Sequence, residues 1–161
     1  AACRALDTPV CTGEDIYLKE GFLPLLQARA VNIIHPDLAT SGGIMETKKI
    51  GDLAEEYGVS MALHMAGTPV STMASVHCAA ATKNFIALEH HFSTIPFWGD
   101  FIDGVPKPII QQGHIPVPEG PGLGITIDED AIKEHLVPWD RGFFEPTTQW
   151  DNEHSHDRLW S

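Results

Sequence analysis

The chain has 161 residues, a formal net charge of −12 at neutral pH and an ordinary globular content of 43% hydrophobic residues. This length is enough for one domain with a sizeable core. The negative charge argues against nucleic acid and against an anionic membrane surface as partners, because both attract basic proteins. No apolar run approaches the roughly 18 residues that a membrane span requires.

The cysteines Cys3, Cys11 and Cys78 are odd in number and show no CxxC spacing. We therefore predict reduced thiols and a cytoplasmic protein. The first six residues lack an initiator Met and the features of a signal peptide. We interpret them as the last turn of a helix that begins earlier, and we expect that an N-terminal part is missing.

From residue 8 to about residue 90 the chain repeats an apolar stretch, a polar or glycine-containing turn and then a helix. The stretches predicted as strands are 8–12, 30–34, 59–63 and 85–88. The helices predicted after the first three are 18–28, 44–57 and 70–82. In the second helix one predicted apolar face comprises Met45, Ile50, Leu53, Ala54 and Tyr57. This alternation favours a buried parallel sheet with right-handed crossovers.

The composition changes after residue 92. The segment 93–128 is rich in proline and glycine, which is typical of loops and short strands. A helix capped by Asp128 is predicted to follow, and an irregular tail comes after it. We therefore divide the chain into residues 1–92 and residues 93–161.

Four polar residues, Glu14, Asp37, His64 and Glu89, each follow a predicted strand directly, at spacings of 23, 27 and 25 residues. One unit of a (β/α)8 barrel averages about 30 residues, and barrel enzymes carry catalytic groups at the carboxyl ends of their strands. The alternative role of a helix N-cap suits Asp37 but not Glu or His. We predict an α/β fold that contains part of a (β/α)8 barrel.

Several short strings resemble the enolase superfamily, and specifically its mandelate racemase/muconate lactonizing enzyme group, which includes acid-sugar dehydratases. They are Thr12-Gly13-Glu14, His35-Pro36-Asp37 with Ser41-Gly42-Gly43-Ile44, the strand that ends in His64, and Ala87-Leu88-Glu89-His90. The resemblance covers roughly residues 8–128 and implies that the four strands are the fifth to eighth of a barrel. It implies that 1–92 is the later half of the barrel. The segment 93–161 would complete the barrel end and return to a capping domain.

The resemblance also implies a role for each of the four residues. Glu14 matches the third carboxylate ligand of Mg²⁺, His64 the general base and Asp37 the partner of that base. Glu89 matches the acid that hydrogen-bonds the substrate carboxylate. These types suit the chemistry, because removal of a proton alpha to a carboxylate needs a base and concentrated positive charge. Magnesium prefers oxygen ligands, and a His–Asp pair accepts a proton near neutral pH.

The implied function is Mg²⁺-dependent abstraction of the proton alpha to a carboxylate, followed by dehydration of an acid sugar. Such an enzyme is a carbon–oxygen lyase, in which His64 returns its proton to the leaving β-hydroxyl. The first two carboxylate ligands of the metal would lie on earlier strands, absent from this chain. We therefore expect a truncated part of an enzyme that is inactive alone, and a homo-oligomeric complete protein.

Two alternatives remain. A racemase or epimerase of the same superfamily would form the same enolate, but it needs proton acceptors on both faces of the substrate. A non-catalytic assembly module would associate through the open edges of the half barrel. His35 and the pair His90-His91 are candidates for the rim of the pocket, with a structural role as the alternative. No HxH motif ends a strand, which disfavours a histidine-rich metal hydrolase.

Overall fold

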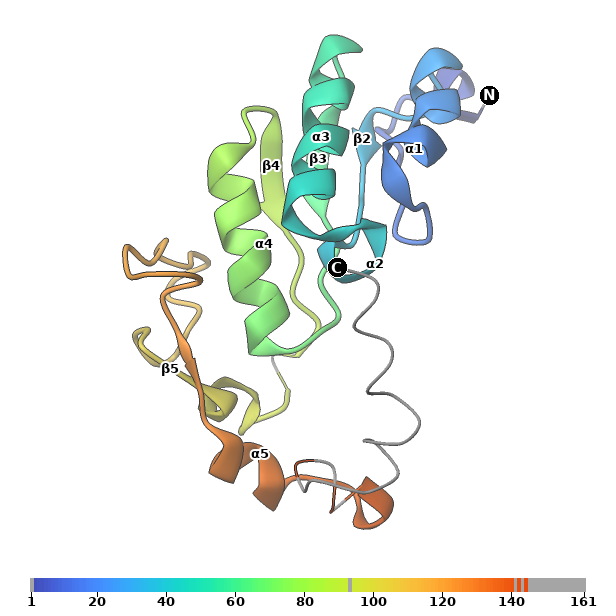
Figure 1. The fold of residues 1–161 in the computed structure, drawn as a ribbon. Coiled ribbons are helices and arrows are strands. Elements are labelled where there is room, and N and C mark those ends of the chain that lie inside the picture. Colours follow the sequence, from blue (N-terminus) through green and yellow to red (C-terminus); the bar gives the residue numbers. More distant parts are fainter. Residues whose placement is uncertain (1, 93, 141, 143, 145–161) are drawn as a thin grey trace, which may run out of the picture. The chain divides into compact units, whose positions relative to one another are not determined.

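The computed structural model describes every residue except 1, 93, 141, 143 and 145–161 (Figure 1). The chain divides into two compact units, residues 1–127 and residues 128–161. The second unit contains α5 (Glu129–Glu134) and the short 3-10 helix η3 (Pro138–Asp140). Asp128 accepts a hydrogen bond from the backbone N–H of Ala131 at 2.9 Å, which confirms the predicted N-cap.

The first unit is built on a parallel four-stranded sheet. Its strands are β1 (Cys11–Thr12), β2 (Ile33–Ile34), β3 (Ser60–Leu63) and β4 (Phe85–Leu88). The strands lie in the order β1-β2-β3-β4, so that each pairs with the next one along the chain. The predicted α/β fold with a parallel sheet is confirmed. Within the described residues, β1 and β4 are the two edges of this sheet.

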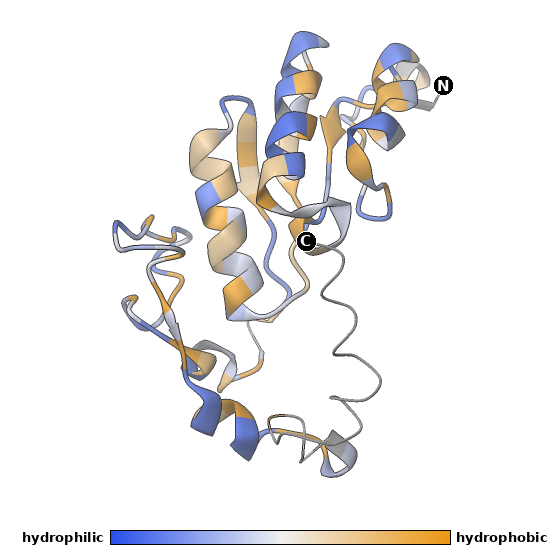
Figure 2. Ribbon diagram, in the orientation of Figure 1, coloured by the Kyte–Doolittle hydropathy of each residue, from blue (hydrophilic) through white to orange (hydrophobic). Residues whose placement is uncertain are grey.

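Three helices follow the strands and lie along one face of the sheet (Figure 1). They are α1 (Leu18–Gln27), α3 (Gly43–Glu56) and α4 (Pro69–Ala81). The strands β3 and β4 are mostly hydrophobic, whereas α3 carries both hydrophilic and hydrophobic turns (Figure 2). A one-turn helix that the sequence did not predict, α2 (Leu38–Ser41), lies between β2 and α3. No helix within the described residues has the length and apolar character to cross a membrane.

The predicted apolar face of α3 is partly wrong. Ile50 and Ala54 are fully buried, but Met45 is 72% exposed. The buried line runs instead through Thr47, Ile50, Gly51 and Ala54, at positions i, i+3, i+4 and i+7. Small side chains are needed along it, because a Cβ at Gly51 would lie 2.6 Å from Thr82 Cγ2, next to the end of α4.

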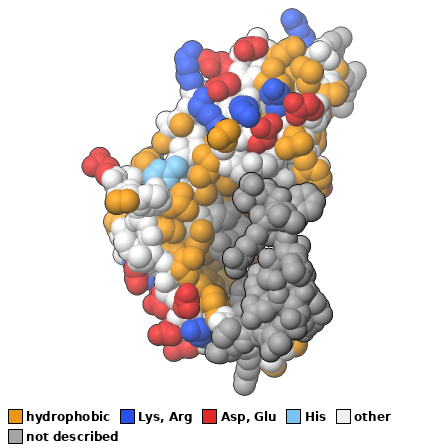
Figure 3. Space-filling model, in the orientation of Figure 1, with side chains coloured by type: hydrophobic (Ala, Val, Ile, Leu, Met, Phe, Trp, Pro, Cys, Tyr) orange, Lys and Arg blue, Asp and Glu red, His pale blue; other side chains and the backbone are white. Residues whose placement is uncertain are grey.

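The core below these helices joins them to the sheet. Its fully buried members are Phe22, Leu26, Ile34, Ile50, Ala54, Met61 and Leu63. The opposite side of α3 faces solvent and carries the Lys48–Asp52 pair. Acidic and basic side chains lie intermixed on the upper part of the face seen in Figure 3. Such burial of one helix face supplies most of the free energy that holds a helix on a sheet.

The segment 94–127 packs with the sheet and belongs to the first unit. It contains the 3-10 helix η2 (Trp98–Phe101) and the strands β5 (Ile102–Asp103) and β6 (Thr126–Ile127), which pair antiparallel. The indole N–H of Trp98 donates to the carbonyl of Gly67 at 3.0 Å. Buried Trp98, Ile102 and Ile109 form a second core cluster with residues of α4. The loops and short strands predicted here are therefore anchored on the sheet.

Candidate active site

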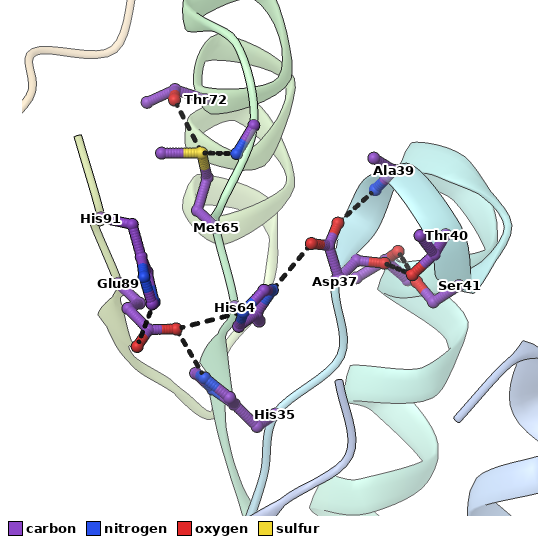
Figure 4. Close-up of polar contacts among 12 residues, drawn as sticks. His35, Asp37, Ala39, Thr40, Ser41, His64, Met65, Thr72, Glu89 and His91 are labelled. Carbon is purple, nitrogen blue, oxygen red and sulfur yellow. Dashed lines mark hydrogen bonds and ion pairs between the residues drawn. The ribbon is translucent and has the colours of Figure 1, made fainter. Parts of the chain in front are cut away.

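The carboxyl ends of the strands are held at one level by backbone hydrogen bonds that continue past the strands. The N–H of His35 donates to Thr12 O at 3.0 Å, that of His64 to Pro36 O at 3.1 Å and that of Glu89 to Leu63 O at 2.9 Å. Asp37 and His64 form a parallel bridge. The side chains of three successive units therefore meet at this end of the sheet (Figure 4).

Asp37 and His64 form a close pair. His64 Nδ1 donates to Asp37 Oδ2 at 2.7 Å, and the two side chains are only 18% and 15% exposed. The other oxygen of Asp37, Oδ1, accepts from the N–H of Ala39 at 2.8 Å and caps α2. Asp37 is thus both an N-cap and the partner of a histidine. Because the carboxylate is held from two sides, it keeps the proton on Nδ1 and leaves Nε2 of His64 able to accept one.

Glu89 is surrounded by three imidazole rings. Its Oε2 lies 2.9 Å from His35 Nε2 and 3.7 Å from His64 Nε2, and its Oε1 lies 2.8 Å from His91 Nε2. His35 Nδ1 donates to the carbonyl of Ala62 at 3.1 Å. In a neutral His35 the only proton is then on Nδ1, and Nε2 presents a lone pair to Glu89. The short contact between Nε2 and Oε2 therefore requires a further proton, shared between His35 and Glu89.

The charge of Glu89 follows from two opposing effects. Partial burial raises its pKa, but the hydrogen bonds and charges of His35 and His91 outweigh burial and bring the pKa below its ordinary value. Glu89 is therefore a carboxylate at neutral pH. For Glu89 to act as a proton donor, as the resemblance implies, the proton must come from an imidazole such as His35.

The extended segment 89–91 explains why two adjacent histidines have different surroundings. Side chains alternate along extended backbone, so Glu89 and His91 point to one side and His90 to the other. The ring of His90 lies 4.7 Å from that of Trp98, and its Nδ1 is buried without a partner among the described residues. Burial, followed by the charge of His91, lowers the pKa of His90 and keeps it neutral. His91, and not His90, belongs to the polar cluster.

Glu14 lies at the end of β1 but outside this network. It follows Gly13, whose φ of +140° and whose space suit glycine alone, because a Cβ there would lie 2.7 Å from Phe22 Cε1. The Glu14 side chain is exposed and makes no hydrogen bond or ion pair with the described residues. Burial raises the pKa of the Cys11 thiol, and the charges of Glu89 and Glu14 raise it further.

A cavity of about 870 Å³ borders β4, α4 and the segment 95–117. Glu89 and His90 line it in part, but the rest is mainly apolar, including Val76, Phe85, Leu88, Trp98, Ile109 and Ile115. The polar residues Thr72, Asp100, Lys107 and His114 also line it, but among the described residues none of them bonds to the cluster around Glu89. The polar cluster is therefore the better candidate for chemistry.

The structure brings Asp37, His64 and Glu89 together, as the sequence predicts, and adds His35 and His91. Both additions lie two residues from a predicted site residue, in the pairs His35-x-Asp37 and Glu89-x-His91. In extended backbone such pairs share a side. That period of two is the signal in the sequence that identifies them.

The fold and the cluster define a class of protein: an α/β domain with ionisable side chains gathered at the carboxyl ends of parallel strands. The profile of the family described as enolase C-terminal domain-like matches residues 1–131. The chain therefore belongs to the enolase superfamily, in its mandelate racemase/muconate lactonizing enzyme group.

Individual relatives agree with this assignment. The chain is 44% identical to D-xylonate dehydratase of Haloferax volcanii over 83% of this chain and 32% of that protein. It is 33% identical to D-gluconate/D-galactonate dehydratase of Picrophilus torridus over 91% of this chain and 37% of that protein. The structure of a mandelate racemase/muconate lactonizing enzyme-like protein from Rubrobacter xylanophilus superposes with a TM-score of 0.81 at 41% identity, over 85% of this chain and 35% of that one. The chain spans about a third of the length of these relatives.

Proposed function

We propose that this chain supplies the general base for Mg²⁺-dependent dehydration of an acid sugar, with His64 as the base and Asp37 as its partner. The observation that carries the proposal is the 2.7 Å bond from His64 Nδ1 to Asp37, which leaves Nε2 directed toward Glu89 and the open end of the sheet. A polyhydroxy acid is the substrate class, because the named relatives are aldonate dehydratases.

In the proposed reaction His64 Nε2 removes the proton alpha to the carboxylate, and Asp37 stabilises the imidazolium that forms. The same imidazolium then gives its proton to the β-hydroxyl, the C–O bond breaks and water leaves. The enol that remains tautomerises to a 2-keto-3-deoxy acid. Glu89, which holds hydrogen bonds from His35 and His91, binds the substrate carboxylate when His35 provides the bridging proton.

Among the described residues at the carboxyl ends of the strands, one position fits Mg²⁺. The exposed carboxylate of Glu14 has no competing partner among the described residues and is the oxygen ligand that Mg²⁺ prefers. The imidazole-rich cluster around Glu89 does not suit that ion. When bound, Mg²⁺ supplies positive charge that stabilises the enediolate. One carboxylate binds Mg²⁺ weakly, so further oxygen ligands would come from residues outside this chain.

We also propose that the sheet is the later half of a (β/α)8 barrel, with β1 to β4 as its fifth to eighth strands. Four parallel strands, helices on one face and polar groups at the carboxyl ends support this arrangement. In a closed barrel both edge strands would be paired, and the apolar cavity beside β4 would be covered.

The test is a chimera in which residues 1–131 replace the matching segment of the Haloferax volcanii D-xylonate dehydratase. We expect a folded chimera that forms a keto acid from D-xylonate and exchanges its alpha proton with deuterated water. The His64→Asn form should do neither. A folded chimera that exchanges the proton without releasing water would instead support a racemase or epimerase. A folded chimera with no exchange would contradict the proposal and favour an assembly module.

A further inference from the structure

Three ligand atoms converge between β3 and β4 without any contribution from Glu14. They are His64 Nε2, a carboxylate oxygen of Glu89 and His91 Nε2, and all lie within 4.8 Å of one another. Two ligand atoms on one tetrahedral Zn²⁺ lie roughly 3.4 Å apart, given metal–nitrogen distances near 2.1 Å. The two oxygens of Glu89 each lie near that spacing from one imidazole: Oε1 is 2.8 Å from His91 Nε2, and Oε2 is 3.7 Å from His64 Nε2.

The chemistry of this donor set selects the ion. Two imidazole nitrogens and one carboxylate oxygen suit borderline cations such as Zn²⁺ and Co²⁺, whereas Mg²⁺ prefers oxygen alone. Three protein ligands leave a fourth position for water. The site thus differs in chemistry from the one proposed at Glu14.

Hydrogen bonds that would hold two of the ligands in place are already formed. A histidine that binds a metal through Nε2 usually donates its other N–H to a carboxylate, and His64 donates to Asp37 at 2.7 Å. Asp37 is in turn held by the N–H of Ala39. His35 lies 2.9 Å from the Glu89 carboxylate and binds it from the outside. These hydrogen bonds set the orientations of His64 and Glu89 before any ion arrives.

The site is also open to solvent. The side chains of His91 and Glu89 are 49% and 37% exposed, while that of His64 is 18% exposed. An ion can therefore enter beside His91 and reach His64 without a change in the sheet. We propose that His64, Glu89 and His91 form a binding site for a borderline divalent cation, with Zn²⁺ as the best match.

This site has a consequence that rests on the proposed function. A cation on His64 Nε2 occupies the lone pair that would accept the substrate proton. Zn²⁺ would therefore inhibit proton abstraction in competition with substrate, while excess Mg²⁺ would not relieve the inhibition. The dehydratase activity would fall in proportion to occupancy of the site.

The test uses the full chain, stripped with a chelator and titrated with Co²⁺ and then with Zn²⁺. Tetrahedral Co²⁺ with imidazole ligands gives strong visible absorption, and calorimetry gives the Zn²⁺ affinity. We expect one saturable site in the wild-type chain. His91→Ala and His64→Asn should each abolish the Co²⁺ band, and Asp37→Asn should weaken Zn²⁺ binding by about 10- to 100-fold.

Two controls define the site. His90→Ala changes the adjacent histidine, which faces Trp98, and should keep the band. A double change of His154 and His156 to Ala removes the HxH sequence of the tail and should also keep it. Circular dichroism checks that each variant is folded. The proposal is overturned if the wild-type chain gives no band, if the band survives His91→Ala and His64→Asn, or if it disappears with the tail histidines.

The binding measurement contains no substrate, so its result is independent of the proposed activity. If the chain binds Zn²⁺ at these residues but the chimera has no dehydratase activity, the proposed function is refuted and the proposed metal site stands. If the chimera is active but the chain binds neither Co²⁺ nor Zn²⁺, the proposed metal site is refuted and the proposed function stands.

Discussion

The candidate site has two parts that differ in their contacts: the side chains that follow β2 to β4 bond to one another, whereas the side chain that follows β1 does not. Asp37, His64 and Glu89 are joined through hydrogen bonds and ion pairs to His35 and His91. Glu14 stands exposed and without such a partner among the described residues. The difference teaches that the chain itself preorganises the histidine–carboxylate network, whereas the metal site proposed at Glu14 would depend on ligands from elsewhere.

The largest effect should come from a change of His64, because it is the proposed general base of the reaction. In the chimera, His64→Asn should reduce alpha-proton exchange by about 10²- to 10⁴-fold, the range typical of a lost general base. Deuterium incorporation into D-xylonate, read by NMR, measures it. The matched control is His114→Asn, because the exposed side chain of His114 contacts the nearby carbonyl of Gln112 and, among the described residues, does not bond to the cluster around Glu89. Equal losses in both variants would argue against the role of His64.

Asp37 has two roles that substitutions can distinguish: it caps α2 and it bonds His64. Asp37→Ser keeps a side-chain oxygen for the cap of α2 but loses the carboxylate that faces His64. We expect a thermal stability close to wild type and an activity in the chimera reduced roughly 10²- to 10⁴-fold. Nitrogen NMR of the His64 ring should show that the Nδ1–H tautomer is no longer dominant.

Asp37→Ala completes this test, because it removes both functions. It should lose the same activity and, in addition, about 1 kcal/mol of stability from the lost cap. A Ser variant as unstable as the Ala variant would contradict the cap, and a fully active Ser variant would contradict the partner role.

Glu14→Gln should affect metal binding and leave the histidine network intact. We expect a loss of Mg²⁺ affinity in the chimera of about tenfold or more, because a charged oxygen ligand becomes a neutral one. Calorimetric titration measures it. Asp15→Asn, a change of the adjacent exposed carboxylate, is the control and should leave the affinity unchanged. Unchanged Mg²⁺ binding in Glu14→Gln would remove Glu14 from the metal site.

The smallest effect concerns Glu46, which ties the start of α1 to α3. The backbone N–H of Lys19 donates to Glu46 at 3.0 Å, and this bond, against a smaller opposing effect of burial and with help from Lys49, lowers the pKa of Glu46. A lowered pKa in the folded state stabilises the protein above the pKa of the unfolded chain. That stabilisation disappears as the pH falls through the folded pKa.

Glu46→Gln should therefore lower the melting temperature at neutral pH by about 1–3 °C, with no difference from wild type in acid. Thermal unfolding of the full chain at a series of pH values measures it. Glu56→Gln, on the same helix, is the control. If the difference in melting temperature between wild type and Glu46→Gln persisted at low pH, the charge of the carboxylate would not be its cause.

The order of elements could be predicted because each strand–helix unit carries its own hydrophobic pattern and turn residues. Gly58, with φ of +69°, follows the C-cap Tyr57 of α3, a position at which glycine is typical. The buried face of α3 could not be predicted fully. Its line includes Thr47 and Gly51, which are not hydrophobic but allow close packing.

The sequence by itself determined that Glu14, Asp37, His64 and Glu89 lie at the carboxyl ends of strands, because strand periodicity sets which residues come there. Only the tertiary structure decided which of them meet. Side-chain contacts depend on strand register, on the continuation of the ladder past the strands and on the turn at Gly13. These place His35 and His91 around Glu89 and leave Glu14 without a partner among the described residues, since register is settled by packing between units and not within any one of them.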